Sequence, residues 1–335
     1  MPEETPNRAT MRRIAEQVGV SVATVSRVMN GRPDVSSRTR ELVLQAVRDQ
    51  GLRGGRSVRT GFVGVTVPIV QYEYYALILS GIAEGLYERG LRLALCLTRY
   101  EHIRERTLVE LLVHDASDGG VLITPTESPD ELRALQDQGY PFVVVDPREE
   151  LGGGIPTVSA ANVTGAKEAT DHLLGLGHRR IGVITGPRDL ASMEDRYAGF
   201  CAALASVGIL PDPELVRRGN LDAQSGRAAA TALLSLPDPP TAIFAFNDNM
   251  AVGALQAARQ LGLEVPRQLS IVGFDALDAS RISMPTLTTV RQPLEEMGRL
   301  AVRVLGSVLD GQRTEALGVE LATELLVGES TAPPG

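Results

Sequence analysis

Residues 18–31 read VGVSVATVSRVMNG, and they decide the fold of the N-terminal part of the chain. Gly19 provides the left-handed residue of a tight turn that ends one helix, and Ser21 can cap the next helix. A third helix is expected to begin after a cap at Ser36 or Ser37. Helix, glycine-containing turn and helix form the helix-turn-helix pattern. The residues expected to face inward are Ile14, Ala15 and Val18 in the first helix, Val25, Val28 and Met29 in the second, and Leu42, Val43, Ala46 and Val47 in the third.

Charge is distributed unevenly along the chain. Residues 1–60 contain 11 arginines against 6 acidic side chains, which gives a net charge of +5. The remaining residues contain 22 basic and 35 acidic side chains, a net charge of −13, so that the whole chain carries −8. A small basic module joined to an acidic body favours a polyanion as the partner of the first segment.

The second helix of a helix-turn-helix unit lies in the major groove of DNA, with its N-terminal residues at the base edges. Arg27 can donate two hydrogen bonds to a guanine edge, while Val22 and Ala23 can contact thymine methyl groups. Hydroxyl and amide side chains nearby are suited to hydrogen bonds with DNA phosphates, and such bonds orient the protein without specifying sequence. The alternative is a three-helix bundle that contacts another protein. The DNA-binding candidates are Ser21, Val22, Ala23, Thr24, Ser26, Arg27, Asn30 and Ser36.

From residue 62 onward, short apolar runs alternate with helical patterns in the manner of βαβ units. We therefore expect an all-α headpiece over 8–52, a linker over 53–61, and a two-lobed α/β body with parallel sheets over 62–330. The expected strands are FVGVTVP (62–68), LRLALCLT (91–98), GGVLITP (119–125), PFVVVD (141–146), RIGVITG (180–186), AIFAFND (242–248), LSIVGFD (269–275) and TLTTV (286–290). The expected helices cover 74–89, 103–113, 129–138, 162–176, 192–207, 222–235, 248–261 and 293–310.

Ligands of such folds bind outside the carboxyl ends of the strands. This rule selects polar side chains suited to a small polar ligand such as a sugar or a nucleobase. Each has a structural alternative: Asp248 as a helix cap, Asp146 and Asp275 as acceptors for loop amides, and the tyrosines as core residues. The ligand-binding candidates are Tyr74, Tyr75, Thr124, Asp146, Arg196, Asn247, Asp248 and Asp275.

The segments VGVSVATVSRVMNG and VSSRTRELVLQAV resemble the headpiece of LacI/GalR-type bacterial transcription repressors. The blocks YEYYALILSGIAEGL, LLGLGHRRIGVITG, FAFNDNMAVGAL and VPRQLSIVGFDALDASRISMPTLTTVRQPLEEMG are similar to their effector domain, itself similar to periplasmic sugar-binding proteins. The resemblance covers nearly the whole chain. It implies a transcription regulator of the repressor type that is controlled by a sugar or sugar derivative, with a nucleobase as the second choice of effector. It also places Tyr74, Tyr75, Arg196, Asn247 and Asp275 in the effector cleft.

The chain departs from this family's pattern at several positions. The family's hinge helix, which follows the third helix, is expected to be absent, because only nine residues separate Leu52 from Phe62 and they include Gly54-Gly55. Leu221 stands where relatives often have an aromatic residue, Ala161 where an Asp is common, and Pro147 where an Arg is frequent. The short linker motivates an alternative function, a small-molecule-binding protein with only weak or non-specific DNA binding.

Several other classes of protein are disfavoured by the sequence. The chain has no GxxxxGK[ST], GxSxG or HExxH motif and no GxGxxG after a strand, so catalysis is not expected. Cys96 and Cys201 lack metal-site spacing, and neither a cofactor nor a metal is expected. No apolar run approaches the ~18 residues of a membrane span, which predicts a cytoplasmic protein. One headpiece contacts few base pairs, so a homodimer on a palindromic operator is expected.

Overall fold

A computed structural model describes residues 8–29, 35–49, 60–102, 106, 109, 117–152, 154–311 and 318–335. The chain divides into two compact units, Met1–Gly61 and Phe62–Gly335. Asn30, most of the linker over 53–61 and most of the helix expected over 103–113 lie outside the described residues.

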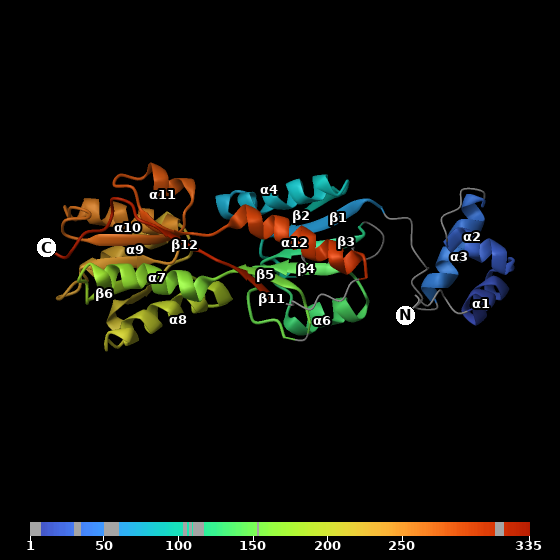
Figure 1. Cartoon of the computed structure of the whole chain (residues 1–335), viewed down its shortest axis with the longest axis horizontal. Coiled ribbons are helices and arrows are strands. Elements are labelled where there is room, and N and C mark those ends of the chain that lie inside the picture. The colour runs from blue at the N-terminus through green and yellow to red at the C-terminus, as the bar shows by residue number, and fades with distance from the viewer. Residues whose placement is uncertain are drawn as a thin grey trace. The chain divides into compact units, whose positions relative to one another are not determined.

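The first unit contains the three expected helices, α1 (Arg8–Val18), α2 (Val22–Met29) and α3 (Ser37–Asp49) (Figure 1). Gly19 has a φ of +73°, and the amide of Val20 returns to the carbonyl of Ala15 at 3.0 Å, which turns the chain between α1 and α2. The small core of this unit contains Ile14, Ala15, Val25, Val28, Val43 and Ala46. The expectation for Leu42 is wrong, because its side chain is 52% exposed. The inward face of α3 is formed by Val43 and Ala46, which are three residues apart, and Leu42 lies outside that face.

The first lobe of the body, here the N-lobe, is a parallel six-stranded sheet in the order β11-β5-β4-β3-β1-β2. Helices α4 and α12 cover one face and α6 covers the other (Figure 1). Val63, Val65 and Val67 of β1 point to the first face, as the two-residue period of a strand requires. The elements are β1 (Phe62–Val67), α4 (Glu73–Glu88), β2 (Arg92–Leu97), β3 (Gly119–Ile123), α6 (Pro129–Asp137), β4 (Phe142–Val145), β5 (Thr157–Ala160), α12 (Leu294–Leu309) and β11 (Gly318–Leu321).

The second lobe, here the C-lobe, has the sheet order β12-β10-β9-β8-β6-β7, and β12 alone pairs antiparallel in it. Helices α7 and α8 pack together on one face, and α9 packs with α10 on the other (Figure 1). The elements are α7 (Asn162–Gly175), β6 (Ile181–Thr185), α8 (Ala191–Ser206), the 3-10 helix η2 (Pro213–Leu215), β7 (Val216–Arg218), α9 (Ala223–Leu234), β8 (Ala242–Ala245), α10 (Asp248–Gln260), β9 (Ser270–Asp275), α11 (Asp278–Ile282), β10 (Thr288–Arg291) and β12 (Glu324–Leu326).

The strand order of both lobes creates a switch point, where neighbouring strands lead to helices on opposite faces. It falls between β1 and β3 in the N-lobe and between β6 and β8 in the C-lobe. The chain crosses between the lobes at residues 160–162, 291–294 and 321–324, so that α12 returns to the N-lobe after the C-lobe strands. Ligands of doubly wound sheets bind at such switch points, outside the carboxyl ends of the strands.

The eight strands expected from apolar runs are present, whereas β5, β7, β11 and β12 were not predicted. These four strands are three or four residues long. Three of them, β7, β11 and β12, lie at a sheet edge and contain charged side chains. An edge strand is covered on fewer sides, so it lacks the apolar run that identifies a central one.

Candidate effector cleft and DNA-reading helix

Strained backbone gathers at the carboxyl ends of the strands. Among the described residues, seven non-glycine residues have φ in the left-handed region, and each lies within three residues of a strand's C-terminal end. Such conformations are costly for residues other than glycine and cluster at functional sites. The residues are Arg99 and Tyr100 after β2, Thr124 after β3, Asp146 after β4, Leu221 after β7, and Asp275 and Ala276 at the end of β9.

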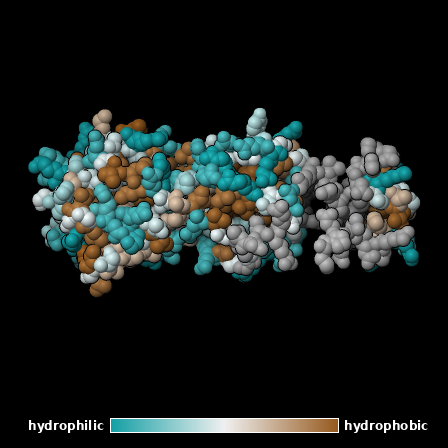
Figure 2. Space-filling view, viewed as in Figure 1, coloured by the Kyte–Doolittle hydropathy of each residue, from teal (hydrophilic) through white to brown (hydrophobic). Residues whose placement is uncertain are grey.

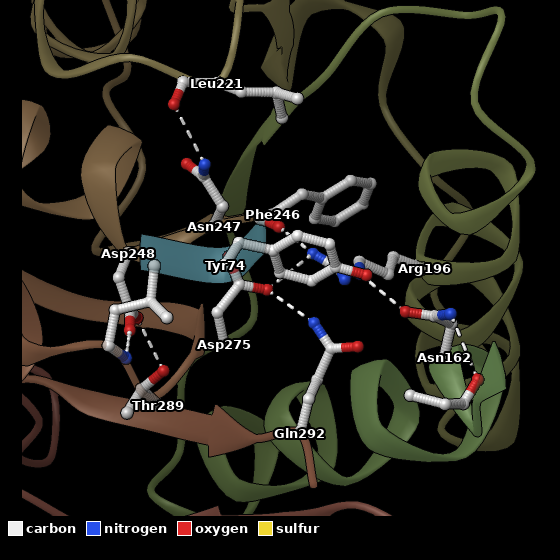
Figure 3. Close-up of polar contacts among 12 residues, drawn as sticks. Tyr74, Asn162, Arg196, Leu221, Phe246, Asn247, Asp248, Asp275, Thr289 and Gln292 are labelled. Atoms are coloured by element: carbon white, nitrogen blue, oxygen red, sulfur yellow. Dashed lines mark hydrogen bonds and ion pairs between the residues drawn. The ribbon is translucent and has the colours of Figure 1, made fainter. Parts of the chain in front are cut away.

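Arg196 and Asp275 form the centre of the site in the C-lobe (Figure 3). Arg196, on α8, is 3% exposed, and its Nη1 lies 3.3 Å from Oδ1 of Asp275. Its Nε donates to Oδ1 of Asn162 at 2.8 Å, and its Nη1 also donates to the carbonyl oxygen of Phe246. The guanidinium carbon lies 3.7 Å from the ring centroid of Phe274. The cation is therefore held rigidly by hydrogen bonds and an aromatic face.

Gln292 completes this cluster from the second crossing between the lobes. Its Nε2 donates to Oδ1 of Asp275 at 2.7 Å. Asn162 lies at the first crossing and also donates through Nδ2 to the carbonyl of Ala160 at 3.1 Å. Two residues beside the crossings thus hold the ion pair of the C-lobe.

The facing wall comes from the N-lobe. The Tyr74 hydroxyl donates to Oδ2 of Asp146 at 2.9 Å, and the Tyr75 hydroxyl lies 2.9 Å from that of Tyr100. The two neighbouring rings meet edge to face, with centroids 5.2 Å apart. Thr124, 2% exposed, stands at the end of the adjacent strand β3. This wall offers hydroxyls, a carboxylate and aromatic faces, which suit a polar ligand with hydroxyl groups.

Burial changes the acidity of the cleft groups. Burial raises the pKa of Asp275 to about 6, while the Arg196 charge and the Gln292 hydrogen bond oppose this rise. Burial also raises the pKa of Asp146, against the hydrogen bond from Tyr74 and the charge of Arg196. The pKa of Tyr74 lies well above its usual value because of burial and the charges of Asp146 and Asp275. Tyr74 therefore remains a neutral donor near physiological pH.

Asn247 and Asp248 occupy different positions, although they are adjacent in sequence. Asn247 caps α10 by accepting from the amide of Met250 at 2.9 Å, and it donates to the carbonyl of Leu221 at 3.0 Å. Asp248 is fully buried, and it accepts from the Thr289 hydroxyl at 2.6 Å and from the Leu277 amide at 2.8 Å. Its carboxylate therefore ties α10 to β10 and to the start of α11.

The loops around the cleft also touch across the two lobes. Both carboxylate oxygens of Glu73, in the N-lobe, accept from the amide of Asp278 in the C-lobe at 3.0 and 3.1 Å. Arg148 of the N-lobe forms an ion pair with Asp189, and its carbonyl accepts from the amide of Ala191 at 2.7 Å. The two lobes thus meet in the described arrangement through contacts that are separate from the central ion pair.

Sequence reasoning missed Asn162, Phe246, Phe274, Gln292 and Tyr100. Gln292 comes directly after β10, so the strand-end rule could have identified it. Asn162 follows β5, a strand that was itself missed. The side chain of Phe274 and the carbonyl of Phe246 belong to apolar runs, where nothing in the sequence signals a contact with a guanidinium.

In the headpiece, the side chains on α2 divide into exposed and packed positions. Ala23 and Arg27 are exposed, whereas Val22 is partly buried against the headpiece core, and Thr24 and Ser26 are half-buried. Ser21 is exposed and caps α2, because its Oγ accepts from the amide of Thr24 at 3.1 Å and lies 2.8 Å from the Thr24 hydroxyl. Ser36 is exposed and caps α3 in the same way toward Thr39.

Other side chains singled out by the sequence have structural roles. His178 is buried between Thr241, Ser270 and the carbonyl of Ala332, and His172 contacts Thr331. Cys96 and Cys201 are partly buried free thiols. Within the described ranges, no group of three or more His, Cys, Asp or Glu side chains is placed to hold a metal ion. None of the described helices has both the length and the apolar character needed to cross a membrane.

A helix-turn-helix unit followed by a two-lobed body of parallel sheets defines a DNA-binding transcription regulator with a periplasmic-binding-protein-like body. The chain belongs to the lacI family of bacterial regulatory proteins. The model of that family matches residues 10–51, and the model of the periplasmic binding protein-like domain matches residues 170–331.

Proteins that are similar to nearly the whole chain support this membership. The HTH-type transcriptional repressor CytR of Escherichia coli K12 is 33% identical over 329 residues, which is 96% of each chain. A solved complex of the transcriptional regulator CelR with cellobiose is 34% identical, with a TM-score of 0.76 over 96% of this chain and 99% of that chain. A LacI family transcriptional regulator from Enterococcus faecium with bound ribose is 27% identical, with a TM-score of 0.73 over 82% and 100%. These relatives are named as regulators, not as enzymes.

Proposed function

We propose that this regulator represses transcription as a homodimer on a palindromic operator, and that a sugar or sugar derivative bound between the lobes controls it. In this assignment residues 8–52 are the DNA-binding headpiece, 53–61 the linker and 62–330 the effector-binding and dimerisation body. The protein acts in the bacterial cytoplasm, on the DNA of the nucleoid.

The observation that carries the DNA-binding proposal is the exposure of Ala23 and Arg27 on the second helix of the headpiece. They are four residues apart and therefore share one face of α2. Arg27 reads a guanine and Ala23 contacts a thymine methyl group, with Val22 beside them. The remaining DNA-binding candidates, Ser21, Thr24, Ser26, Asn30 and Ser36, contact phosphate or orient the helix.

The effector proposal rests on the strained strand ends and the polar groups that gather there. Arg196 and Asp275 bind vicinal hydroxyls from the C-lobe, and Tyr74 and Asp146 bind from the N-lobe. Tyr75, Thr124 and Asn247 complete the lining, and Asp248 positions α10 and α11 beside it. Cellobiose and ribose, found in the two solved relatives, agree with a hydroxyl-rich ligand. A ligand that prefers one lobe arrangement shifts the population of that arrangement and so changes operator affinity.

A homodimer is favoured by the needs of DNA recognition and by exposed apolar side chains on the body. Tight specific binding requires two half-sites, because one headpiece reads few base pairs. Strand β2 is a sheet edge with Leu95 43% exposed, and Tyr87 nearby in sequence is 84% exposed. Figure 2 shows hydrophobic areas among hydrophilic surface on both lobes.

The proposal is tested by selecting duplexes from a random library with the full-length protein at a stated salt concentration. A palindromic consensus is expected. Arg27→Ala should then lose about 1–3 kcal/mol at one operator position, whereas the control Arg12→Ala, at an exposed pair with Glu16 on α1, should leave the preference at that position unchanged. Failure to enrich any sequence, with and without a metabolite panel, would favour the alternative of a small-molecule-binding protein with non-specific DNA affinity. The nine-residue interval between Leu52 and Phe62 motivates that alternative.

A further inference from the structure

The cleft has an excess of negative charge. The carboxylates of Asp275, which is buried, and Asp146, which is partly buried, come from opposite lobes and interact electrostatically with each other. Arg196 is the cation whose charge lowers the pKa of both Asp146 and Asp275. With Asp146, Asp275 and Arg196 ionised, the cleft carries a net charge of about −1, which is unfavourable away from bulk water unless a proton or a cation compensates it.

The next cation along the chain does not correct this imbalance. Pro147 separates Asp146 from Arg148, and the Arg148 guanidinium forms its ion pair with Asp189 in the C-lobe. Arg148 thus joins the lobes outside the central cluster. A cationic group on a bound ligand would balance the second carboxylate.

In Asp275 of the C-lobe and Asp146 of the N-lobe, one carboxylate oxygen accepts no hydrogen bond from the described residues. In Asp275, the hydrogen bonds from Arg196 and Gln292 both end on Oδ1, so Oδ2 accepts none from the described residues. In Asp146, the Tyr74 hydroxyl donates to Oδ2, so Oδ1 is likewise left without a donor from the described part of the chain. Both aspartates have left-handed backbone at strand ends, with φ of 109° and 50°, which fixes their direction.

Resting on the effector role proposed above, we infer that the effector carries a protonated amine on a hydroxyl-rich frame, as an amino sugar does, and that this amine bridges Asp146 and Asp275. An ammonium group has three donors, enough to serve an oxygen from each lobe at once. Its charge attracts the Asp146 and Asp275 carboxylates, so it favours an arrangement in which the two lobes lie close together. A phosphate or carboxylate on the ligand would meet these two aspartates and be repelled.

The test uses the full-length protein and three matched sets of probes: glucosamine, galactosamine and mannosamine, their neutral parent sugars, and the 6-phosphates of those parents. Binding is measured by ligand-induced thermal stabilisation and by calorimetry. At least one amino sugar should bind tenfold or more tightly than its neutral parent, and no phosphate should bind. Asp146→Asn and Asp275→Asn should each remove that preference, while Asp130→Asn, at an exposed surface pair with Arg133, should keep it.

If none of the nine probes binds, a second experiment identifies the ligand directly. The full-length protein is incubated with a bacterial metabolite extract, and the bound small molecule is identified by native mass spectrometry. A captured amine supports the inference. A captured neutral or anionic ligand, or a parent sugar that binds as well as its amine, overturns the inference and leaves the effector role standing. If neither experiment finds a ligand, the effector role itself fails.

Discussion

Replacing Arg196 by alanine should destabilise the body strongly and in a pH-dependent way. Arg196 is 3% exposed and donates to three acceptors, on Asn162, Phe246 and Asp275. Its removal leaves the Asp275 carboxylate buried without its cation, and breaking a buried pair in this way costs about 3–5 kcal/mol. We expect a loss of this size at pH 8, measured by urea unfolding followed by far-UV circular dichroism. Tryptophan fluorescence cannot report, since the chain has no tryptophan.

The pH dependence follows from the linkage between protonation and folding. The folded pKa of Asp275, about 6, lies above its ordinary value of 3.8. This group's contribution to stability is therefore fully present below pH 3.8 and is lost as the pH rises through about 6. Without Arg196 the pKa of Asp275 rises further. Each additional pKa unit adds about 1.4 kcal/mol to the cost of the substitution, at a pH above the pKa of Asp275 in both the original protein and the variant.

The cost of Arg196→Ala should therefore be smaller at pH 5 than at pH 8 by at least about 1.4 kcal/mol. Adding Asp275→Asn removes the stranded charge and should recover part of the loss at pH 8. The control is Arg133→Ala, at an exposed pair with Asp130, whose effect should stay within about 0.5 kcal/mol. Equal costs of Arg196→Ala at the two pH values, or a cost below about 1 kcal/mol at pH 8, would refute the reasoning.

Three further substitutions test the packing, the headpiece and the lobe contact. Gly81→Ala should lower the free energy of unfolding in urea by about 1–3 kcal/mol, because the added Cβ would lie 1.9 Å from a carbonyl oxygen of α12. The control Gly175→Ala has open space around the added Cβ and should be neutral or stabilising. Ser21→Ala should lower headpiece stability by about 1 kcal/mol through loss of the α2 cap, and Ser21→Asn should retain it; equal thermal midpoints would contradict the cap. Glu73→Ala should speed amide exchange at Asp278 by roughly tenfold or more, and unchanged exchange would exclude this hydrogen bond as a contact between the lobes.

Local patterns in the sequence were enough to predict the three helices of the headpiece and the eight strands with apolar runs. Gly19 and Ser21 act within a few residues of themselves, through a left-handed turn and a helix cap. The apolar runs of the central strands are buried on both faces, so their composition alone identifies them. Arg196 and Asp275 could be selected because parallel strands bring their carboxyl ends to one edge.

The tertiary structure decided which of the selected residues join the cluster around Arg196 and Asp275. Asp248 and Asp275 both come at or just after the end of a strand, yet Asp248 is turned inward by Thr289, which is 41 residues away in sequence. Asn162 and Gln292 join the ion pair from two separate crossings between the lobes. Sequence periodicity describes one element at a time, whereas these contacts depend on how distant elements pack. That packing also decides which oxygens of Asp146 and Asp275 accept no hydrogen bond from the described residues.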